Sequence, residues 1–227
     1  MATNIGPESG KPHWHRPHMG EHRWPISIIV LLVIALQYVL PSTLSLSFQS
    51  FFCLVEAVLL IAVFVFNPRR ISQHVAPTRA LGLILVGIMT LSNTASAIKL
   101  IDAIITRGVT DARSLLLSGG SIWLTNVVVF ALWFWELDRG GPGKRAQALH
   151  PYPDFIFPQM SDPSYAPAHW HPKFFDYLYT SFTNASAFSP TDVMPLTRWA
   201  KMLMLVQSMT ALLIVGLVIA RAVNILH

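Results

Sequence analysis

The sequence predicts an all-α integral membrane protein with five transmembrane helices and a re-entrant half-helix and loop before the last of them. Three observations lead to this fold class. Of the 227 residues, 53% are hydrophobic and 12% are charged, which is well below the charged share of soluble domains. Apolar stretches long enough to cross a bilayer alternate with polar connections. Tryptophans and basic residues flank these stretches, as expected at a membrane–water interface.

Residues 1–25 are predicted to form a polar N-terminal tail outside the membrane. The tail carries His13, His15, His18 and His22. Imidazole is a common metal ligand, but this spacing fits no closed zinc site and no cysteine supports one. We therefore expect no metal, and a titratable tail in contact with lipid headgroups. A cleavable signal peptide is not expected, because the tail before the first apolar run is too long.

Residues 26–114 are expected to form an N-terminal bundle of three membrane helices. The predicted helices cover about 26–40, 48–66 and 80–105. The first is short and is closed by Pro41, which cannot continue a helix. Polar, arginine-containing connections follow the second and third helices.

Two ionisable residues, Glu56 and Lys99, lie well inside the predicted second and third helices. Because these helices are antiparallel, both side chains would sit roughly 9–12 Å below the same membrane face, at about 1.5 Å per residue. A lone charge at depth costs about 2.5–3.5 kcal/mol on insertion scales, and pairing lowers that cost. We therefore predict an intramembrane ion pair. A proton or ion relay is the functional alternative.

Residues 115–227 are expected to form a second unit, which begins with a membrane helix over about 115–137. The connection 138–172 contains seven prolines and several aromatic residues, so it is predicted to pack as an extended cover over the bundle. The segment Phe174–Ala187, which contains FDYLYTSFTNASA, is too short to cross a bilayer of roughly 30 Å, so it is predicted to be a half-helix that ends at membrane depth. Pro190 and Pro195 interrupt the chain after it. A long apolar helix then runs from Arg198 to about residue 224.

The last helix carries a predicted polar stripe. At about 100° per residue, Gln207, Thr210, Arg221 and Asn224 fall within one arc of roughly 100°. A polar stripe on an apolar membrane helix faces the bundle interior or a wet cavity. The alternative is ordinary helix packing through Gln and Ser hydrogen bonds.

The basic residues predict the membrane orientation and exclude other functions. Most lie in the tail, in the loop around Arg69 and Arg70, and in the 138–172 connection, so the positive-inside rule places these segments in the cytoplasm.

The basic residues flank apolar segments, and nucleic acid is therefore not an expected partner. The single cysteine, Cys53, excludes a disulfide framework. The sequence contains no nucleophile elbow, phosphate loop, HExxH pair or CxxC, so we expect neither an enzyme nor a cofactor.

The C-terminal segment resembles the pore module of tetrameric potassium channels, in which a pore helix and filter loop precede a long inner helix. The matching residues are Tyr179, Ser181, Phe182, Asp192, Pro195, Thr197 and Arg198. They cover roughly a third of the chain together with the helix 115–137, which corresponds to the outer helix. The resemblance implies a homo-tetrameric channel with its re-entrant loop outside the cell. This orientation is opposite to the one that the charge distribution predicts.

The filter of those channels has no counterpart here. Its T-x-G-Y-G signature is replaced by Ala187, Phe188, Ser189, Pro190 and Thr191. A potassium filter lines its carbonyls with glycines in backbone conformations that other residues rarely adopt, and proline is fixed near φ of about −65°. The loop is therefore predicted to have a filter of another type.

The same stretch is also similar to uncharacterised bacterial multi-pass membrane families with F-D-F/Y-L-Y, S-F-T, S-D and V-N-I patterns. Here the corresponding residues are 175–179, 181–183, 191–192 and 223–225. The similarity implies the architecture and a bacterial inner membrane, but no established activity.

The sequence thus favours an ion-conducting homo-oligomer whose partners are the lipid bilayer and small ions, a tetramer if it is channel-like. The residues predicted to line its constriction are Thr183, Asn184, Ser186, Ala187, Phe188, Ser189, Pro190, Thr191 and Asp192. Their hydroxyl and amide groups would offer ligands, and Asp192 a charge at the mouth. One alternative is a non-conducting subunit or sensor that binds a partner through this loop. A small-solute transporter comes third, because no inverted repeat is visible.

Overall fold

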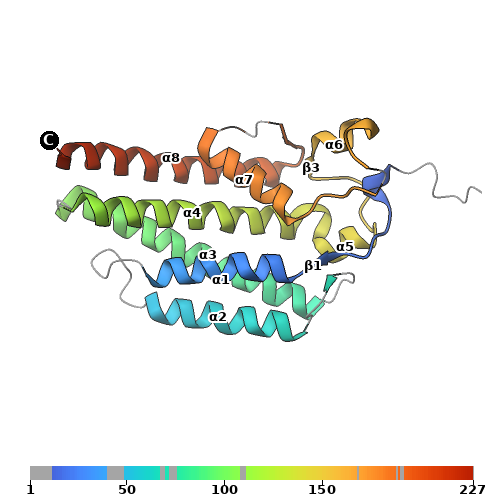
Figure 1. The fold of residues 1–227 in the computed structure, drawn as a ribbon, viewed down its shortest axis with the longest axis horizontal. Coiled ribbons are helices and arrows are strands. Elements are labelled where there is room, and N and C mark those ends of the chain that lie inside the picture. Colours follow the sequence, from blue (N-terminus) through green and yellow to red (C-terminus); the bar gives the residue numbers. More distant parts are fainter. Residues whose placement is uncertain are drawn as a thin grey trace, which may run out of the picture.

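The computed structural model describes residues 12–39, 49–66, 70–71, 76–107, 111–167, 169–187, 189 and 192–226. The molecule is an elongated helical bundle with irregular structure gathered at one end (Figure 1). We call this end the cap; it is formed by the described parts of residues 12–23, 138–173 and 192–197.

Five helices run along the bundle. They are α1 (Trp24–Tyr38), α2 (Gln49–Phe66), α3 (Ala76–Asp102), α4 (Ala112–Leu137) and α8 (Arg198–Leu226). Within the described part of the chain, four helices are long and apolar enough to cross a membrane: α2, α4, α8, and α3 with its π-helical extension η2 (Ala103–Arg107). The prediction of an all-α membrane protein is confirmed. The fifth predicted span is α1, whose 15 residues fall short of the roughly 20 that a span needs.

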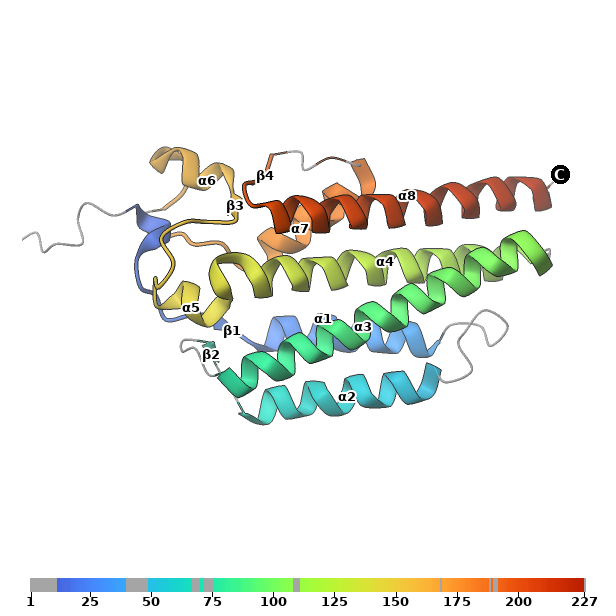
Figure 2. The ribbon, with the colours of Figure 1, turned by 180° about the vertical axis from the view of Figure 1, so that it is seen from behind.

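Successive bundle helices alternate in direction. From the cap, α1, α3 and α8 lead away, while α2 and α4 lead back to it (Figures 1 and 2). The described tail residues 12–23, residues 70–71 between α2 and α3, and the start of α8 therefore lie at the cap end, and the C-terminal end of α8 lies at the other. This is the grouping that the sequence predicts. Which face is cytoplasmic stays a prediction.

The central element of the bundle is α4, which contacts α1, α3, α7 and α8 and so packs against both predicted units. Its residues 127–135 are apolar on all sides, as expected for a helix segment surrounded by protein. Gly119 allows α8 to approach closely, since a Cβ at this position would lie 2.6 Å from Val218 Cγ2.

The course of α3 differs from that of its neighbours. It crosses the bundle diagonally, beginning beside α2 at the cap and ending beside α4 and α8 at the opposite end (Figure 2). Its last turns supply Ala97, Leu100 and Ala103 to a separate apolar cluster that also contains Leu115 and Ile214.

The predicted cover over the bundle is observed as short elements. They are η3 (Asp138–Gly140), α5 (Pro142–Ala146), α6 (Pro158–Ser161) and η4 (Pro163–Tyr165). The N-terminal tail adds η1 (His13–His15) to the same end of the molecule. Two small antiparallel pairings hold the cap together: β1 (Glu21–His22) with β2 (Arg70–Ile71), and β3 (Phe155–Ile156) with β4 (Met194–Pro195). The buried ring of Phe155 packs against Phe134 and Trp199, so β3 is fixed on the ends of α4 and α8.

Candidate functional site: the re-entrant hairpin and its buried anchor

The half-helix is observed as α7 (Phe174–Ala187), with the predicted bounds. It leaves the cap and ends partway along the bundle, whereas β4 pairs with β3 at the cap, just before α8 begins (Figure 1). Asp176 Oδ2 accepts a hydrogen bond from Lys173 N at the start of α7. We call α7 together with the described residues 189 and 192–197 the hairpin.

Contacts with α4 and α8 fix the depth at which α7 ends. Ser181 Oγ donates to Val127 O at 2.6 Å, and the buried Ala185 packs with Val127 and Ala211. Between Val127 and the end of α4 at Leu137, the helix rises by about 15 Å. The last turn of α7 therefore lies well below the cap, near the middle of the bundle.

A buried amide joins α7 to α8. Gln207 Nε2 donates to Ser181 O at 2.9 Å and to Ser181 Oγ at 2.6 Å, while Gln207 Oε1 accepts from Asn184 Nδ2 at 2.8 Å. Asn184 Nδ2 also donates to Met204 O, at 2.9 Å. Hydrogen bonds strengthen in a low-dielectric interior, so this node holds α7 firmly against the longer helix.

The rest of the predicted stripe on α8 does not join this node. Thr210 Oγ1 donates to Val206 O within its own helix, at 2.9 Å. Arg221 is half-buried and Asn224 is exposed. Of the four residues, Gln207 is the one that faces the bundle interior.

Most of the predicted pore residues that the structure describes lie on the outer side of the hairpin. Thr183 Oγ1 and Ser186 Oγ donate to carbonyls of α7 itself. Ser186, Ala187, Ser189 and Asp192 are exposed, whereas Asn184 is buried in the Gln207 node. Phe188, Pro190 and Thr191 lie outside the described residues.

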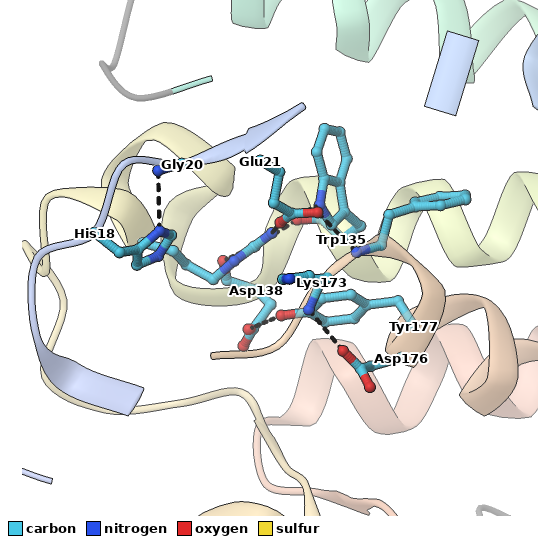
Figure 3. Close-up of polar contacts among 10 residues, drawn as sticks. His18, Gly20, Glu21, Trp135, Asp138, Lys173, Asp176 and Tyr177 are labelled. Atoms are coloured by element: carbon cyan, nitrogen blue, oxygen red, sulfur yellow. Dashed lines mark hydrogen bonds and ion pairs between the residues drawn. The ribbon is translucent and has the colours of Figure 1, made fainter. Parts of the chain in front are cut away.

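The base of α7 is held by a buried ionic cluster at the cap, which Figure 3 shows in part. Tyr177 OH donates to Asp138 Oδ2 at 2.5 Å, and Asp154 N donates to Asp138 Oδ1 at 2.9 Å. Asp154 in turn accepts hydrogen bonds from Arg139 N at 2.8 Å and from Trp199 Nε1 at 3.0 Å. The first turns of α7 and α8 are thereby joined to the end of α4.

Arg145 and Glu21 complete this cluster. Arg145 Nη1 donates to Trp135 O at 2.5 Å and to Asp138 O at 2.9 Å, and its Nη2 lies 3.7 Å from Glu21 Oε1. Glu21 also accepts from Trp135 Nε1 and Phe174 N, at 3.0 and 2.8 Å. Burial raises the pKa of Glu21, and Arg145 opposes that rise. Burial disfavours the charge of Arg145, yet Tyr177, Asp138 and Glu21 together raise its pKa.

The sequence does not predict this cluster, because charged residues at the ends of apolar segments are normally interfacial. The sequence does contain a feature that could have indicated a buried ionic cluster. Charged residues closely follow the tryptophans that end an apolar helix, and a turn with two basic residues comes a few residues later. Such groups are rarely fully buried unless they are paired.

Two histidines of the cap stack on each other beside a pocket of about 520 Å³, with ring centroids 3.7 Å apart. They are His18 and His171. Burial, followed by the positive surroundings of His171 and Arg145, lowers the pKa of His18 to about 3. Burial also lowers the pKa of His171. Among the described residues, no group of three or more His, Cys, Asp or Glu side chains is arranged to hold a metal ion.

The predicted ion pair between Glu56 and Lys99 is not formed. Glu56 is fully buried, and within the described structure neither of its carboxyl oxygens has a hydrogen-bond partner. Lys99 is half-buried on the part of α3 that has crossed from α2 to α4 and α8 (Figure 2). The two residues lie at different depths. Their shared contact with Gln37 places Ser92 level with Gln49, and from that level Lys99 lies about 10 Å farther from the cap whereas Glu56 lies about 10 Å closer to it.

Comparison with known proteins gives no relative: no family model, no curated protein and no solved structure matches the chain.

Proposed function

We propose that the protein is a homo-oligomeric, ion-conducting membrane protein whose pore is formed by the hairpins of several copies. The observation that carries this proposal is the position of α7, which ends near mid-depth with Ser186 and Ser189 exposed on the outside of the protomer. Polar, non-helical backbone at membrane depth is tolerated only where protein surrounds it or where it lines a water-filled cavity. If the hairpins of neighbouring copies enclose an aqueous path, each hairpin is covered by protein on one side and faces water on the other.

The polar groups on the inner side of α7 argue that one copy alone does not conduct. Asn184 and Gln207 are buried and engaged with each other and with backbone carbonyls. The exposed polar residues of the hairpin, which could meet ions, are Ser186, Ser189 and Asp192 on its outer side. The resemblance to potassium-channel pore modules favours a tetramer, and the similarity to bacterial families favours a bacterial inner membrane.

Ion flux into liposomes tests the proposal. The purified protein should conduct at least one of a panel of cations and anions, and Asp192→Asn should change flux or selectivity without dissociating the oligomer, because it removes a charge near the pore mouth. Asp162→Asn makes the same change in η4's N-terminal turn and should leave flux unaltered. Absence of flux for every ion, or equal effects of both variants, contradicts the proposal.

A second function is favoured by the aromatic side of α7. Phe175, Tyr179 and Phe182 recur at helical spacing and are 57%, 53% and 47% exposed. Such a ridge suits packing against an apolar helix of another protein, so the chain would be a non-conducting subunit. Stable association with a different membrane protein, together with absence of flux in the reconstituted complex, would favour this function over a pore.

A further inference from the structure

A polar cluster lies inside the apolar bundle formed by α1, α2 and α3, on the side of the molecule away from the hairpin (Figure 2). Gln37 Oε1 accepts hydrogen bonds from Ser92 Oγ at 3.0 Å and from Gln49 Nε2 at 3.3 Å. Glu56 lies two turns beyond Gln49 on the same face of α2, and all of these side chains are buried. The cluster thus places a carboxyl group among neutral polar side chains.

Several polar atoms of this cluster have no hydrogen-bond partner among the described residues. They are both carboxyl oxygens of Glu56, Nε2 of Gln37 and Oε1 of Gln49. Nε2 of Gln37 is a donor that either form of the Glu56 carboxyl can accept, whereas Oε1 of Gln49 needs a donor, which only the protonated form can supply. A protonated carboxylic acid offers one donor and one acceptor, and it therefore matches the orphaned groups where an ionised carboxylate does not.

The surroundings of Glu56 also disfavour an ionised carboxylate. Gln37 and Cys53 lie close to Glu56, and Ser92 bonds to Gln37; all three side chains are uncharged at neutral pH. Moving an unpaired charge from water into such an interior is strongly unfavourable. A bound proton removes that penalty.

A cavity lies between α1, α2, α3 and α4, on the cap side of Glu56. Its lining includes Leu60, one helical turn from Glu56, and Arg23 and Glu136 near the cap, but not Glu56 itself. The space that water-sized molecules can occupy is about 40 Å³. Because one water needs roughly 10–15 Å³ by this measure, the cavity has room for a few water molecules.

We propose that Glu56 is a proton-binding site inside the membrane that exchanges its proton with the cap face through this cavity. The carboxylate takes up one proton from water in the cavity and returns it by the same route, and no oxidant or reductant is involved. Glu136 stands at the cap end of the route, beside Arg23. This inference concerns a different part of the molecule from the proposed pore and does not depend on it.

Infrared difference spectroscopy of the purified protein in lipid vesicles tests the proton site. At pH 7 the wild type should show the carbonyl stretch of a protonated carboxylic acid that Glu56→Gln lacks. Asp162→Asn should retain that band, since hydrogen bonds from Ser164 lower the pKa of Asp162 and keep it ionised. If the Glu56→Gln spectrum loses only carboxylate bands, the proposal is overturned. Loss of the wild-type band on replacing choline by Na⁺ at constant pH would also overturn it, in favour of a metal-cation site.

Exchange into D₂O tests the route. The band should shift to lower frequency, and Val63→Phe, which fills the cavity, should slow that shift. Val65→Phe is the matched control, because Val65 is 68% exposed on the outer face of α2 while Val63 is 5% exposed. Equal exchange rates in the two variants would overturn the cavity route. Helicity and elution volume identify any variant that has not folded. The wild-type spectra with and without Na⁺ test the proton site without relying on any variant.

Discussion

Tyr177 and Asp138 are joined by a hydrogen bond of 2.5 Å, and both residues are fully buried at the cap. The bond connects the first turn of α7 to the residue that follows α4. Asp138 receives a second bond from the backbone of Asp154, so the connection between α4 and β3 is tied to the same point. The orientation of the half-helix is therefore set at its base, far from the tip that would meet ions.

Removing this hydroxyl should destabilise the protein measurably. Tyr177→Phe leaves a buried carboxyl oxygen without its donor, and an unsatisfied buried group costs about 1–3 kcal/mol. The expected result is a lower midpoint of thermal unfolding in detergent. Tyr179→Phe removes the same atom from an exposed side chain two residues away and should have little effect. Equal shifts for the two variants would contradict the role assigned to the Asp138 contact.

The Gln207 node predicts strong coupling between α7 and α8. Asn184→Ala and Gln207→Ala each remove one side of the contact, so the double variant should lose less stability than the sum of the single losses. For residues in one buried network the coupling is about 0.5–3 kcal/mol. A double-mutant cycle by denaturant titration measures it. Pairing Asn184→Ala with Thr210→Ala gives the control, because Thr210 bonds only within its own helix; coupling of similar size there would show that the node is not specific.

The stacked histidines predict loss of stability in acid. The pKa of His18 is about 3 in the folded protein, below its usual value of 6.5, so the unfolded chain binds more protons in this window. The stability contribution is complete above pH 6.5 and declines as the pH falls toward 3. His18→Gln should therefore show a shallower decrease in unfolding temperature between pH 7 and 5 than the wild type. A pH dependence as steep as that of the wild type would contradict the prediction. Glu21, whose pKa is raised, acts in the opposite direction in both proteins and cancels in the comparison.

Membrane orientation can be measured with single cysteines in a Cys53→Ser background. Gln147 and Asn224 are exposed residues at the cap and at the opposite end of the bundle. If the cap is cytoplasmic, as the basic residues predict, Gln147→Cys should be shielded from an impermeant thiol reagent in whole cells, and Asn224→Cys should react. The reverse pattern would restore the orientation of potassium channels. Lysed cells, in which both positions should react, provide the control.

The sequence predicted the helices well where the signal is local. The bounds of α7 follow from Pro172 before it and Pro190 after it, and the long apolar runs locate the bundle helices. Errors at helix starts have a local cause. α1 and α3 begin two and four residues before the predicted starts at 26 and 80 because Pro25 and Pro77 fit the first helical turn, where no backbone donor is needed.

The sequence could not predict the tilt of the helices or which charged residues, distant in the sequence, come into contact. The diagonal course of α3 and the depth of Lys99 relative to Glu56 depend on tertiary contacts, such as the apolar cluster around Leu100 and the bond of Ser92 to Gln37. The contact of Glu21 with Arg145 joins positions 124 apart in the chain, and no local pattern marks it.

The hydrogen bonds between α7 and α8 also constrain the order of membrane insertion. Asn184 finds both of its acceptors on α8, which is synthesised after α7. Until α8 has left the ribosome, a half-helix at membrane depth would hold an amide with no partner in hydrocarbon, which is costly. The segment is therefore expected to wait at the membrane surface and enter together with α8 as one unit. A chain cut short before Met204 would keep its earlier helices and yet expose an unassembled hairpin, the kind of defect that membrane quality-control proteases remove.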